Sequence, residues 1–433
     1  MTHKRTILGI ALATAGALAD TQAEDWPNWR GPSGDGVAEG VRYPIQWDEE
    51  TNVKWRVDLP GPGNSSPIIS GSRVFISQPV ADENRRTVMA FDRQTGETLW
   101  QKGVVYDKEE TTHRTNPYCS ASPSTDGERV VATFGSAGVY CYSVEGEPLW
   151  ERDLGPQVHI WGNASSPVIH ENVVIIYHGP GEFSRMVALD LATGAIVWEA
   201  EDPAIVTKGR TDGFRGQEPG NTGSFSTPML LPSPNGAQLV MSYHNQLVSM
   251  NPATGETYWT ANGLNPLVYT STVSDGETIV AMGGYSGNSI AISAWGEGQR
   301  DEEILWKNQR DAGGVGTGIL YEGHVYFADM RGFGYCYDFE TGEEVWMERL
   351  RAEGANTAYW GSMVRVDDRL YLTNQSSETF VLRASPEFEI IRVNPLDGAT
   401  CNSTPAMADG EIVLRNHEGL WMISEGTDVA SAF

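Results

Sequence analysis

The sequence predicts an all-β protein, an eight-bladed β-propeller with four-stranded antiparallel blades, and three observations support this prediction. A segment that reads A-x-D-x-x-T-G-x-x-x-W returns along the chain at intervals of about 45 residues. A short segment of small hydroxylated residues, often followed by Pro, returns with it. The last repeat lacks its final strand, whereas a spare strand of that kind stands near the start of the chain. A closed ring of radial sheets accounts for all three observations.

The first repeat describes a β-hairpin whose second strand carries a Trp. An alternating strand ends at Asp or Asn, whose side chain can cap the turn, and the Gly of Thr-Gly supplies the positive φ that the turn needs. Good copies begin at Ala90, Ala188, Ser249 and Cys336, a shortened copy spans 141–150, and weaker copies span 294–306 and 382–388. A Trp at the same place in every hairpin predicts packing between neighbouring sheets. These predicted docking residues are Trp55, Trp100, Trp150, Trp198, Trp259, Trp306 and Trp346.

The second repeat marks the innermost strand of each blade. Small side chains suit the crowded centre of a radial array, and Pro is tolerated at the start of a strand, where no ladder hydrogen bond is yet required. Clear copies span 64–67, 120–123, 164–167, 225–228 and 402–405, and weaker copies span 270–273, 316–319 and 360–363. Eight inner strands predict eight blades.

We expect the ring to close with a strand from the start of the chain. Residues 52–57 form a Trp strand without a blade of its own, and the last blade, which contains 411–414 and 419–424, ends before a Trp strand. Pairing the two leaves no open sheet edge. Seven blades are the alternative, if one weak copy is an insertion.

The start of the chain resembles a secretory signal peptide. Lys4 and Arg5 precede an apolar run over 7–19 and a small-residue site that ends at Ala23. The apolar run is shorter than the roughly 20 residues of a membrane-spanning helix, which is the alternative. The expected divisions are a signal peptide (1–23), an irregular wrapping segment (24–51) and a single propeller domain (52–433). We therefore expect an exported, periplasmic or extracellular monomer without stable membrane insertion, and without a cysteine for a lipoprotein anchor.

Charge and cysteine content narrow the possible partners. The 57 acidic against 30 basic residues give a formal charge of −27, which repels phosphate backbones, so nucleic acid is not an expected partner. Cys141 and Cys336 fall inside predicted blades, where a buried thiol is expected, whereas a disulfide between Cys119 and Cys401 stays open. We expect no metal site, because the histidines lack metal-ligand spacing, and no catalytic residues.

The hairpin repeat is similar to the tryptophan docking motif of quinoprotein dehydrogenases and of PQQ-like propeller repeats, over Asn52 to Ser424. The opening segment from Trp26 to Gly36 looks like that of exported PQQ-like repeat proteins of planctomycete-type bacteria. The resemblance implies one of two branches. One contains dehydrogenases with PQQ, calcium, a vicinal Cys-Cys disulfide and an Asp base, and the other contains BamB-type proteins, which bind polypeptide and hold no quinone. This sequence has no adjacent cysteines and is shorter than the enzymes. Both departures favour the BamB-like branch.

The loops that join each Trp strand to the next inner strand should share one funnel. Two of them, 101–118 and 199–224, are long and carry basic and aromatic residues. Arg forms bidentate hydrogen bonds and flat rings stack, so such a funnel can hold an anionic or carboxylate-bearing ligand. The candidate ligand-binding residues are His113, Arg114, His159, Trp161, Arg210, Arg215, Tyr359 and Trp360. Solvated surface decoration with local ion pairs is the alternative.

Three functions follow as hypotheses. The first is an exported, non-catalytic scaffold that binds a protein or polymer partner in the cell envelope and needs no cofactor, as the resemblance to BamB-type proteins implies. The second is a quinoprotein-like oxidoreductase that uses PQQ and Ca²⁺. The third is a polysaccharide-binding propeller in which aromatic side chains stack on sugars.

Overall fold

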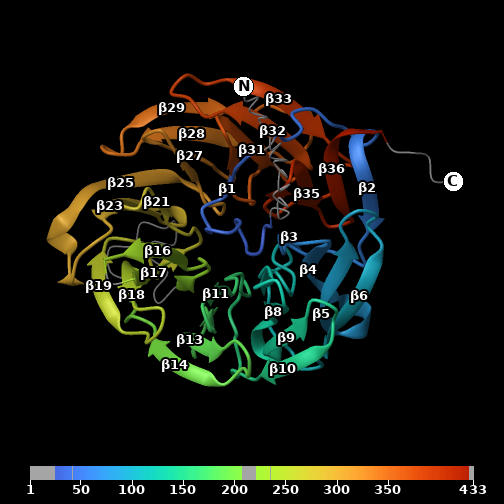
Figure 1. The fold of residues 1–433 in the computed structure, drawn as a ribbon. Coiled ribbons are helices and arrows are strands. Elements are labelled where there is room, and N and C mark those ends of the chain that lie inside the picture. The colour runs from blue at the N-terminus through green and yellow to red at the C-terminus, as the bar shows by residue number, and fades with distance from the viewer. Residues whose placement is uncertain (1–24, 41, 207–220, 235, 429–433) are drawn as a thin grey trace, which may run out of the picture.

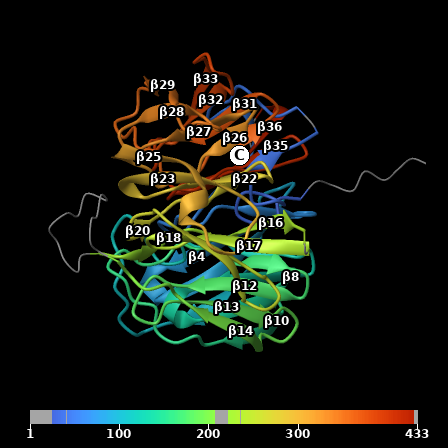
Figure 2. The same cartoon turned by 90° about the vertical axis from the view of Figure 1, so that its left-hand side faces the viewer.

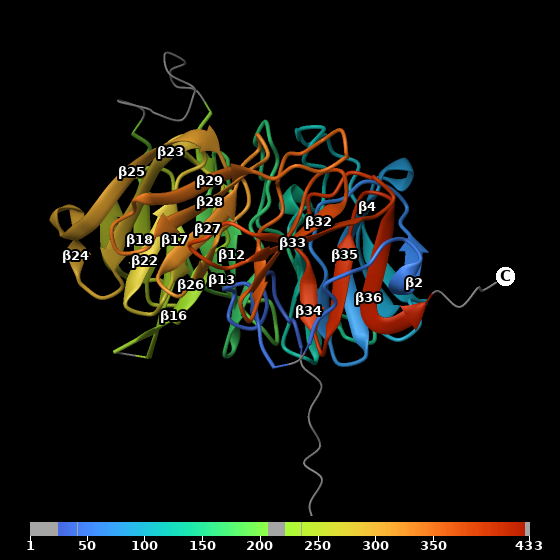
Figure 3. The same ribbon diagram turned by 90° about the horizontal axis from the view of Figure 1, so that it is seen from above.

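The computed structural model describes residues 25–40, 42–206, 221–234 and 236–428. Over these residues the strands form eight antiparallel sheets around a central axis, which confirms the predicted eight-bladed propeller (Figure 1). Figure 2 and Figure 3 show the same ring from two directions at right angles to the axis. Among these residues, no helix has the length and apolar character that crossing a bilayer requires.

Blades 1 to 4 follow one another along the chain, each running from the inner to the outer strand. Blade 1 contains β3 (Ile68–Ser70), β4 (Arg73–Val80), β5 (Arg85–Asp92) and β6 (Thr98–Val105). Blade 2 contains β7 (Ser124–Thr125), β8 (Arg129–Thr133), β9 (Val139–Ser143) and β10 (Pro148–Arg152). Blade 3 contains β11 (Val168–His170), β12 (Val173–His178), β13 (Arg185–Asp190) and β14 (Ile196–Glu201). Blade 4 contains β16 (Met229–Ser233), β17 (Gly236–Ser242), β18 (Gln246–Met250) and β19 (Thr257–Asn262).

Blades 5 to 8 complete the ring. Blade 5 contains β21 (Val273–Ser274), β22 (Thr278–Met282), β23 (Tyr285–Ser293) and β25 (Ile304–Gly313). Blade 6 contains β26 (Ile319–Tyr321), β27 (His324–Ala328), β28 (Phe333–Asp338) and β29 (Glu344–Arg349). Blade 7 contains β30 (Val364–Val366), β31 (Arg369–Thr373), β32 (Glu378–Arg383) and β33 (Ile390–Pro395). Blade 8 contains β34 (Ala406–Ala408), β35 (Glu411–Arg415), β36 (Gly419–Asp428) and β2 (Thr51–Asp58).

Short elements connect or extend the blades. Strand β1 pairs with blade 7, β15 pairs with β20, and β24 extends blade 4. These elements, with three 3-10 turns, are β1 (Val37–Ala38), β15 (Gly223–Ser224), β20 (Leu267–Val268), β24 (Gly298–Gln299), η1 (Ala81–Glu83), η2 (Gly135–Ala137) and η3 (Asp301–Glu303).

The hairpin Trp joins each blade to the next. The indole N–H of Trp55 donates to the Arg93 carbonyl at 2.9 Å, and Gly96, at a φ of 76°, lies against the indole ring. A Cβ at Gly96 would come within 2.8 Å of that ring, so the turn Gly serves both backbone conformation and close packing. The indole N–H groups that make the same bond to the following blade belong to Trp100, Trp150, Trp198, Trp306 and Trp346.

Trp259 departs from this pattern. It is 1% exposed, its indole nitrogen has no hydrogen bond among the described residues, and its ring lies 5.1 Å from the Arg300 guanidinium carbon. The following blade holds the degraded copy of the repeat, which lacks Thr-Gly between Ala294 and Trp306. The partner turn is therefore missing, and a cation over the ring replaces the usual carbonyl.

A ring of hydrogen bonds joins the eight inner strands. The backbone N–H of Ser66 donates to Oγ of Ser122 at 2.8 Å, Ser122 does the same to Ser166, and the last step runs from Thr404 to Ser66 at 2.9 Å. We call this ring the hydroxyl belt; its members are Ser66, Ser122, Ser166, Thr227, Ser271, Thr317, Ser362 and Thr404. The sequence indicated that small side chains suit the axis. The structure adds that the hydroxyl oxygen itself closes the ring.

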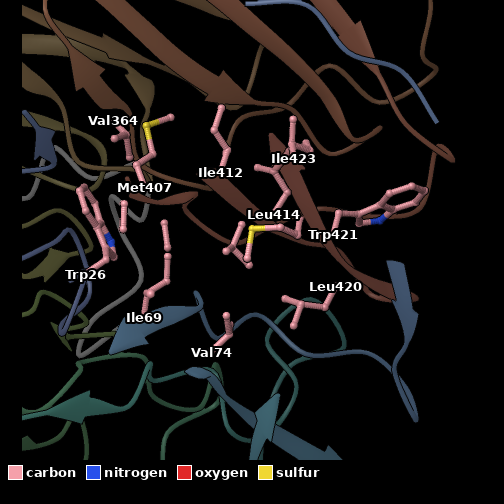
Figure 4. Close-up of a cluster of buried hydrophobic side chains, with 14 of the residues drawn as sticks. Trp26, Ile69, Val74, Val364, Met407, Ile412, Leu414, Leu420, Trp421 and Ile423 are labelled. Atoms are coloured by element: carbon pink, nitrogen blue, oxygen red, sulfur yellow. The ribbon is translucent and has the colours of Figure 1, made fainter. Parts of the chain in front are cut away.

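The predicted closure by the N-terminal strand is confirmed. Strand β2 pairs antiparallel with β36, with Val57 opposite Leu420. Glu411 of blade 8 binds Lys54 of β2 at 2.6 Å and Arg93 of blade 1 at 2.7 Å, so one carboxylate links three parts of the closure. A hydrophobic cluster of blades 8, 1 and 7 lies beside it (Figure 4).

The N-terminal segment crosses the lower face, the side of the hairpin turns. Trp26 pairs with Ile69 by two backbone hydrogen bonds and is buried near Met407 (Figure 4). Further on, β1 pairs with β30, and Trp47 stacks on Tyr371. The sequence predicted an irregular segment that wraps the propeller, and the part of it that leads into β1 passes close to the axis (Figure 1).

The four cysteines are free and buried. Cys119 and Cys401 therefore form no disulfide in this structure. Burial raises the pKa of the Cys119 thiol to about 12 and that of the Cys401 thiol to about 11. Such thiols stay protonated at neutral pH and act as small apolar side chains.

Candidate functional site

A cavity of about 580 Å³ opens around the axis on the upper face, the side of the loops between blades. Six residues of the hydroxyl belt lie at its base, and loops from successive blades form its wall. Its volume falls within the roughly 300–1,000 Å³ of small-molecule sites. The lining consists of Trp29, Asn64, Ser66, His113, Thr115, Asn116, Ser120, Ser122, Trp161, Ala164, Ser166, Phe225, Thr227, Tyr269, Val315, Met330, Trp360, Ser362, Asn402 and Thr404.

A second ring of side chains stands above the hydroxyl belt. In an extended strand, residues two apart point to the same side, so the residue two positions before each belt residue also faces the axis. All eight such residues line the cavity; we call them the upper ring, and they are Asn64, Ser120, Ala164, Phe225, Tyr269, Val315, Trp360 and Asn402. Whereas the belt contains only Ser and Thr, the upper ring varies from blade to blade. The fold requires a hydroxyl side chain at each belt position, but it does not dictate the residue types of the upper ring.

One half of the upper ring is aromatic or apolar. Blades 4 to 7 contribute Phe225, Tyr269, Val315 and Trp360 in succession. The rings of Phe225 and Tyr269 stack with centroids 5.4 Å apart, and Trp161 from a neighbouring loop lies 6.2 Å from Tyr269. Phe225, Tyr269 and Trp161 form an aromatic wall, and Trp360 adds a further aromatic ring to the lining.

Two members of the other half, Asn402 and Asn64, belong to a directed chain of amide groups. The amide nitrogen of Asn356 donates to Gln375 at 2.8 Å, Gln375 donates to Asn402 at 2.6 Å, and Asn402 donates to Asn64 at 3.0 Å. Asn64 then donates to the Thr115 carbonyl at 2.9 Å. Each carboxamide has two N–H donors and an oxygen with two lone pairs, so Asn402, which uses one of each here, keeps polar capacity for a ligand.

Two histidines support these walls as neutral groups. His159 packs edge-on against Phe225 at 5.4 Å, and burial lowers its pKa to about 4. His417 lies 3.1 Å from the Asn64 amide oxygen, and burial, with the nearby Arg415 charge, lowers its pKa to about 4. Both are uncharged at neutral pH.

The loop over 101–118 shapes the rim beside blade 2. His113 contacts the Thr115 hydroxyl through Nδ1 at 2.7 Å, and the Asn116 amide donates to the carbonyls of Trp161 and Asn163. His113 lines the cavity, whereas Arg114 is not among its lining residues.

The N-terminal segment also contributes to the lining of the cavity. Trp29 lines the cavity, and Arg30 is 1% exposed beside the inner strands of blades 6 and 7. The Arg30 guanidinium donates to the carbonyls of Thr317 at 3.1 Å and Gly318 at 2.8 Å. Burial lowers its pKa to about 10, which keeps it charged at neutral pH.

The structure brings only part of the candidate residues together. His113, Trp161 and Trp360 line the cavity, and His159 lies behind Phe225. Tyr359 does not line it: the side chain is 1% exposed and packs against Phe380 in the core of blade 7. Arg210 and Arg215 lie outside the described residues. The sequence analysis did not single out most of the upper ring. Its members could have been found from the sequence, because each lies two positions before a recurrent Ser or Thr.

A second pocket of about 980 Å³ lies between blades 3 and 4 and shares no lining residue with the cavity. Asp202 accepts a hydrogen bond from the Tyr177 hydroxyl at 2.7 Å, and Nδ1 of His244 lies 4.0 Å from the same oxygen. Burial raises the pKa of Asp202 to about 7, although the Tyr177 bond opposes this rise. No repeat or motif in the sequence marks this group.

Solved structures with this fold include BamB and alcohol dehydrogenases. BamB from Moraxella catarrhalis has a TM-score of 0.61 and 10% identity, covering 86% of this chain and 97% of that one. The quinohemoprotein alcohol dehydrogenase from Comamonas testosteroni has a TM-score of 0.68 and 11% identity, covering 94% and 82%. A europium-containing methanol dehydrogenase has a TM-score of 0.63 and 10% identity, covering 92% and 90%. At these identities the likeness shows the fold alone.

Sequence comparison identifies the family. No protein with a curated description matches the chain. The family model described as outer membrane protein assembly factor BamB matches residues 37–215 and 187–427. These matches span most of the chain and include all eight blades. The repeats, the closed ring and this match together show that the chain belongs to the BamB family of PQQ-like β-propellers.

Proposed function

We propose that this protein is an exported, non-catalytic scaffold that holds a protein or polymer partner in the cavity of its upper face. The contrast between the two rings of the cavity carries this proposal. The hydroxyl belt has one chemistry in all eight blades, as a structural element requires, whereas the upper ring has a different side chain in almost every blade. Variation at positions that the fold leaves free is what a binding surface needs.

The described lining suits binding better than quinone chemistry. PQQ bears carboxylates, and Ca²⁺ prefers carboxylate and carbonyl oxygens. The described cavity residues offer aromatic rings, carboxamides, hydroxyls and one imidazole, and none of them is an Asp, Glu, Lys or Arg. Within the described part of the chain, no group of three His, Cys, Asp or Glu side chains is placed to hold a metal ion. This donor set does not fit PQQ with calcium.

The family membership supports a role at the cell envelope. The family's description names an outer membrane assembly factor, and the first residues of this chain resemble a secretory signal peptide. An exported propeller whose cavity is lined by loops from successive blades is suited to holding part of a larger partner.

The oxidoreductase alternative can be tested directly. We expect purified protein titrated with PQQ and Ca²⁺ to show neither saturable absorbance changes nor alcohol-dependent dye reduction. Turnover in that assay would overturn the proposal.

The scaffold role has its own test. We expect the protein to be retained on isolated cell-envelope material, and the double variant Phe225→Ala/Trp360→Ala to lose retention by at least about tenfold, since buried aromatic anchors dominate interfaces. Phe183→Ala is the matched control, because Phe183 is 52% exposed and lines the second pocket instead of the cavity. Equal retention of all three proteins would contradict the proposal.

A further inference from the structure

The geometry points to a saccharide ligand: the cavity takes the end of an uncharged glycan, with sugar rings between the aromatic wall and the amide wall. This inference rests on the proposed function, because it names the partner chemistry for the same cavity. Four features of the cavity carry it.

The first feature is the aromatic wall. Phe225 and Tyr269 stack at an interplanar angle of 25°, Trp161 lies 6.2 Å from Tyr269, and Trp360 also lines the cavity. A pyranose ring has faces of C–H groups that pack on flat aromatic rings through dispersion and burial of apolar area. Aliphatic side chains alone would bury area without offering such planes.

The second feature is the amide wall. Asn402 lines the cavity and is fixed between Gln375 and Asn64, and it keeps one N–H and one oxygen lone pair for a ligand. A sugar hydroxyl both donates and accepts, so a carboxamide is a suitable partner for it. The side chains are already ordered, which reduces the entropy cost of binding.

The third feature is that the two walls occupy opposite arcs of one ring. Blades 4 to 7 carry the apolar members, and blades 8, 1 and 2 carry Asn402, Asn64 and Ser120. A ligand in the cavity therefore meets apolar surface on one side and hydrogen-bonding groups on the other. A sugar ring has this division between its C–H faces and its hydroxyl edge.

The fourth feature is the base. Trp29 lines the cavity and Arg30 lies buried among the inner strands, so the chain blocks passage along the axis from below. The Arg30 guanidinium is bound to carbonyls, as is that of Arg415, which donates to Ser65 at 2.8 Å. Both guanidinium groups are buried and neither lines the cavity, so they do not select an acidic sugar. A cavity closed below accepts the end of a chain.

The experiment uses neutral trisaccharides of glucose, mannose, galactose and N-acetylglucosamine as probes, with tri-galacturonate as the charged contrast. Binding is followed by tryptophan fluorescence, because three Trp side chains line the cavity, and by the rise in melting temperature that a native-state ligand causes. We expect at least one neutral probe to bind with a Kd below about 1 mM and tri-galacturonate to bind at least tenfold more weakly.

Variants locate the site. We expect Trp360→Ala and Asn402→Leu each to weaken binding at least tenfold, while Phe183→Ala binds as the unmodified protein does. Circular dichroism shows whether each variant is folded, and the melting-temperature shift of the unmodified protein provides a readout that needs no variant. Absence of binding by every neutral probe at about 10 mM, or equal binding by Trp360→Ala, overturns the inference.

The result separates the two proposals. If no saccharide binds but the aromatic double variant still loses envelope retention, the ligand is of another class and the scaffold role stands. Turnover with PQQ and Ca²⁺ would remove the scaffold role itself.

Discussion

At the scale of single residues, the hydroxyl belt shows how one atom can set the geometry of a whole ring. Each belt oxygen accepts the N–H of the preceding blade, and the belt residues are buried. A buried N–H without a partner costs about 1–3 kcal/mol. Both Ser and Thr occur in the belt, so its requirement is a hydroxyl on Cβ.

This requirement predicts the behaviour of Ser122. Ser122→Ala leaves the Ser66 N–H without its acceptor, and we expect it to lower the free energy of unfolding by about 1–3 kcal/mol. Ser122→Thr keeps the oxygen and should cost much less, which chemical unfolding of the two variants would show. Equal losses would mean that volume, and not the hydrogen bond, decides the residue at this position.

Asp202 predicts a pH effect on stability. Its pKa is about 7 in the folded protein and near 3.8 when exposed, so the folded state binds the extra proton between these values. Stability from this group is present at low pH and is lost as pH rises toward 7 and above. Four buried or half-buried histidines with lowered pKa values act in the opposite direction; they are His159, His178, His244 and His417.

Comparison with Asp202→Asn isolates the carboxyl from these histidines. We expect the free energy of unfolding of the variant, relative to the unmodified protein, to rise by on the order of a few kcal/mol between pH 5 and pH 8. The melting temperature of the variant, relative to that of the unmodified protein, should rise with it. Calorimetry at each pH measures this difference. A difference that stays constant with pH would show that Asp202 titrates normally.

At the scale of elements, the closure of the ring depends on more than strand pairing. Strand β2 supplies the outer strand of blade 8. The Glu411 carboxylate forms ion pairs both with Lys54 of this strand and with Arg93 of blade 1. Arg93 is 4% exposed, so a carboxylate beside it offsets the cost of its burial.

The ion pairs at the ring closure predict that a single substitution at Glu411 lowers the stability of the protein. Glu411→Gln removes the charge shared by two cations, and we expect a loss of about 2–3 kcal/mol in the free energy of unfolding, since Arg93 retains Asp409 at 3.1 Å. The exposed turn residue Glu147 gives the control Glu147→Gln, which should change stability by less than about 0.5 kcal/mol. If both variants unfold at the same denaturant concentration, this ion-pair network does not stabilise the closure.

At the scale of the whole molecule, negative charge is spread over a closed ring. The formal charge of −27 destabilises a compact body by self-repulsion, and salt screens this repulsion beyond roughly 8–10 Å. Salt also weakens exposed ion pairs such as that of Arg383 with Glu389. The resulting loss of stability is small, because exposed ion pairs contribute little to the free energy of unfolding.

We therefore expect the melting temperature to rise by a few degrees when NaCl is raised from about 0.02 M to about 0.3 M. Differential scanning calorimetry at constant pH would measure the change. A fall in melting temperature would indicate that attractive pairs outweigh the net repulsion.

The sequence determined the blade design of this protein. The recurrent Thr-Gly and Trp, the small hydroxylated segments and the strand at 52–57 predicted eight blades and their closure, because each signal lies within one hairpin or at a fixed spacing from it. Such patterns are set by backbone conformation and by packing between residues that are close in sequence, so they can be recognised in the sequence itself.

Only the tertiary structure decided which residues share the axis. Tyr359 and Trp360 are neighbours, yet one enters the core of blade 7 and the other lines the cavity. Arg30 reaches the inner strands from the far end of the chain, and Asp202 meets Tyr177 across blade 3. Convergence of eight blades brings together residues hundreds of positions apart, and this depends on the closed ring, which no local pattern contains.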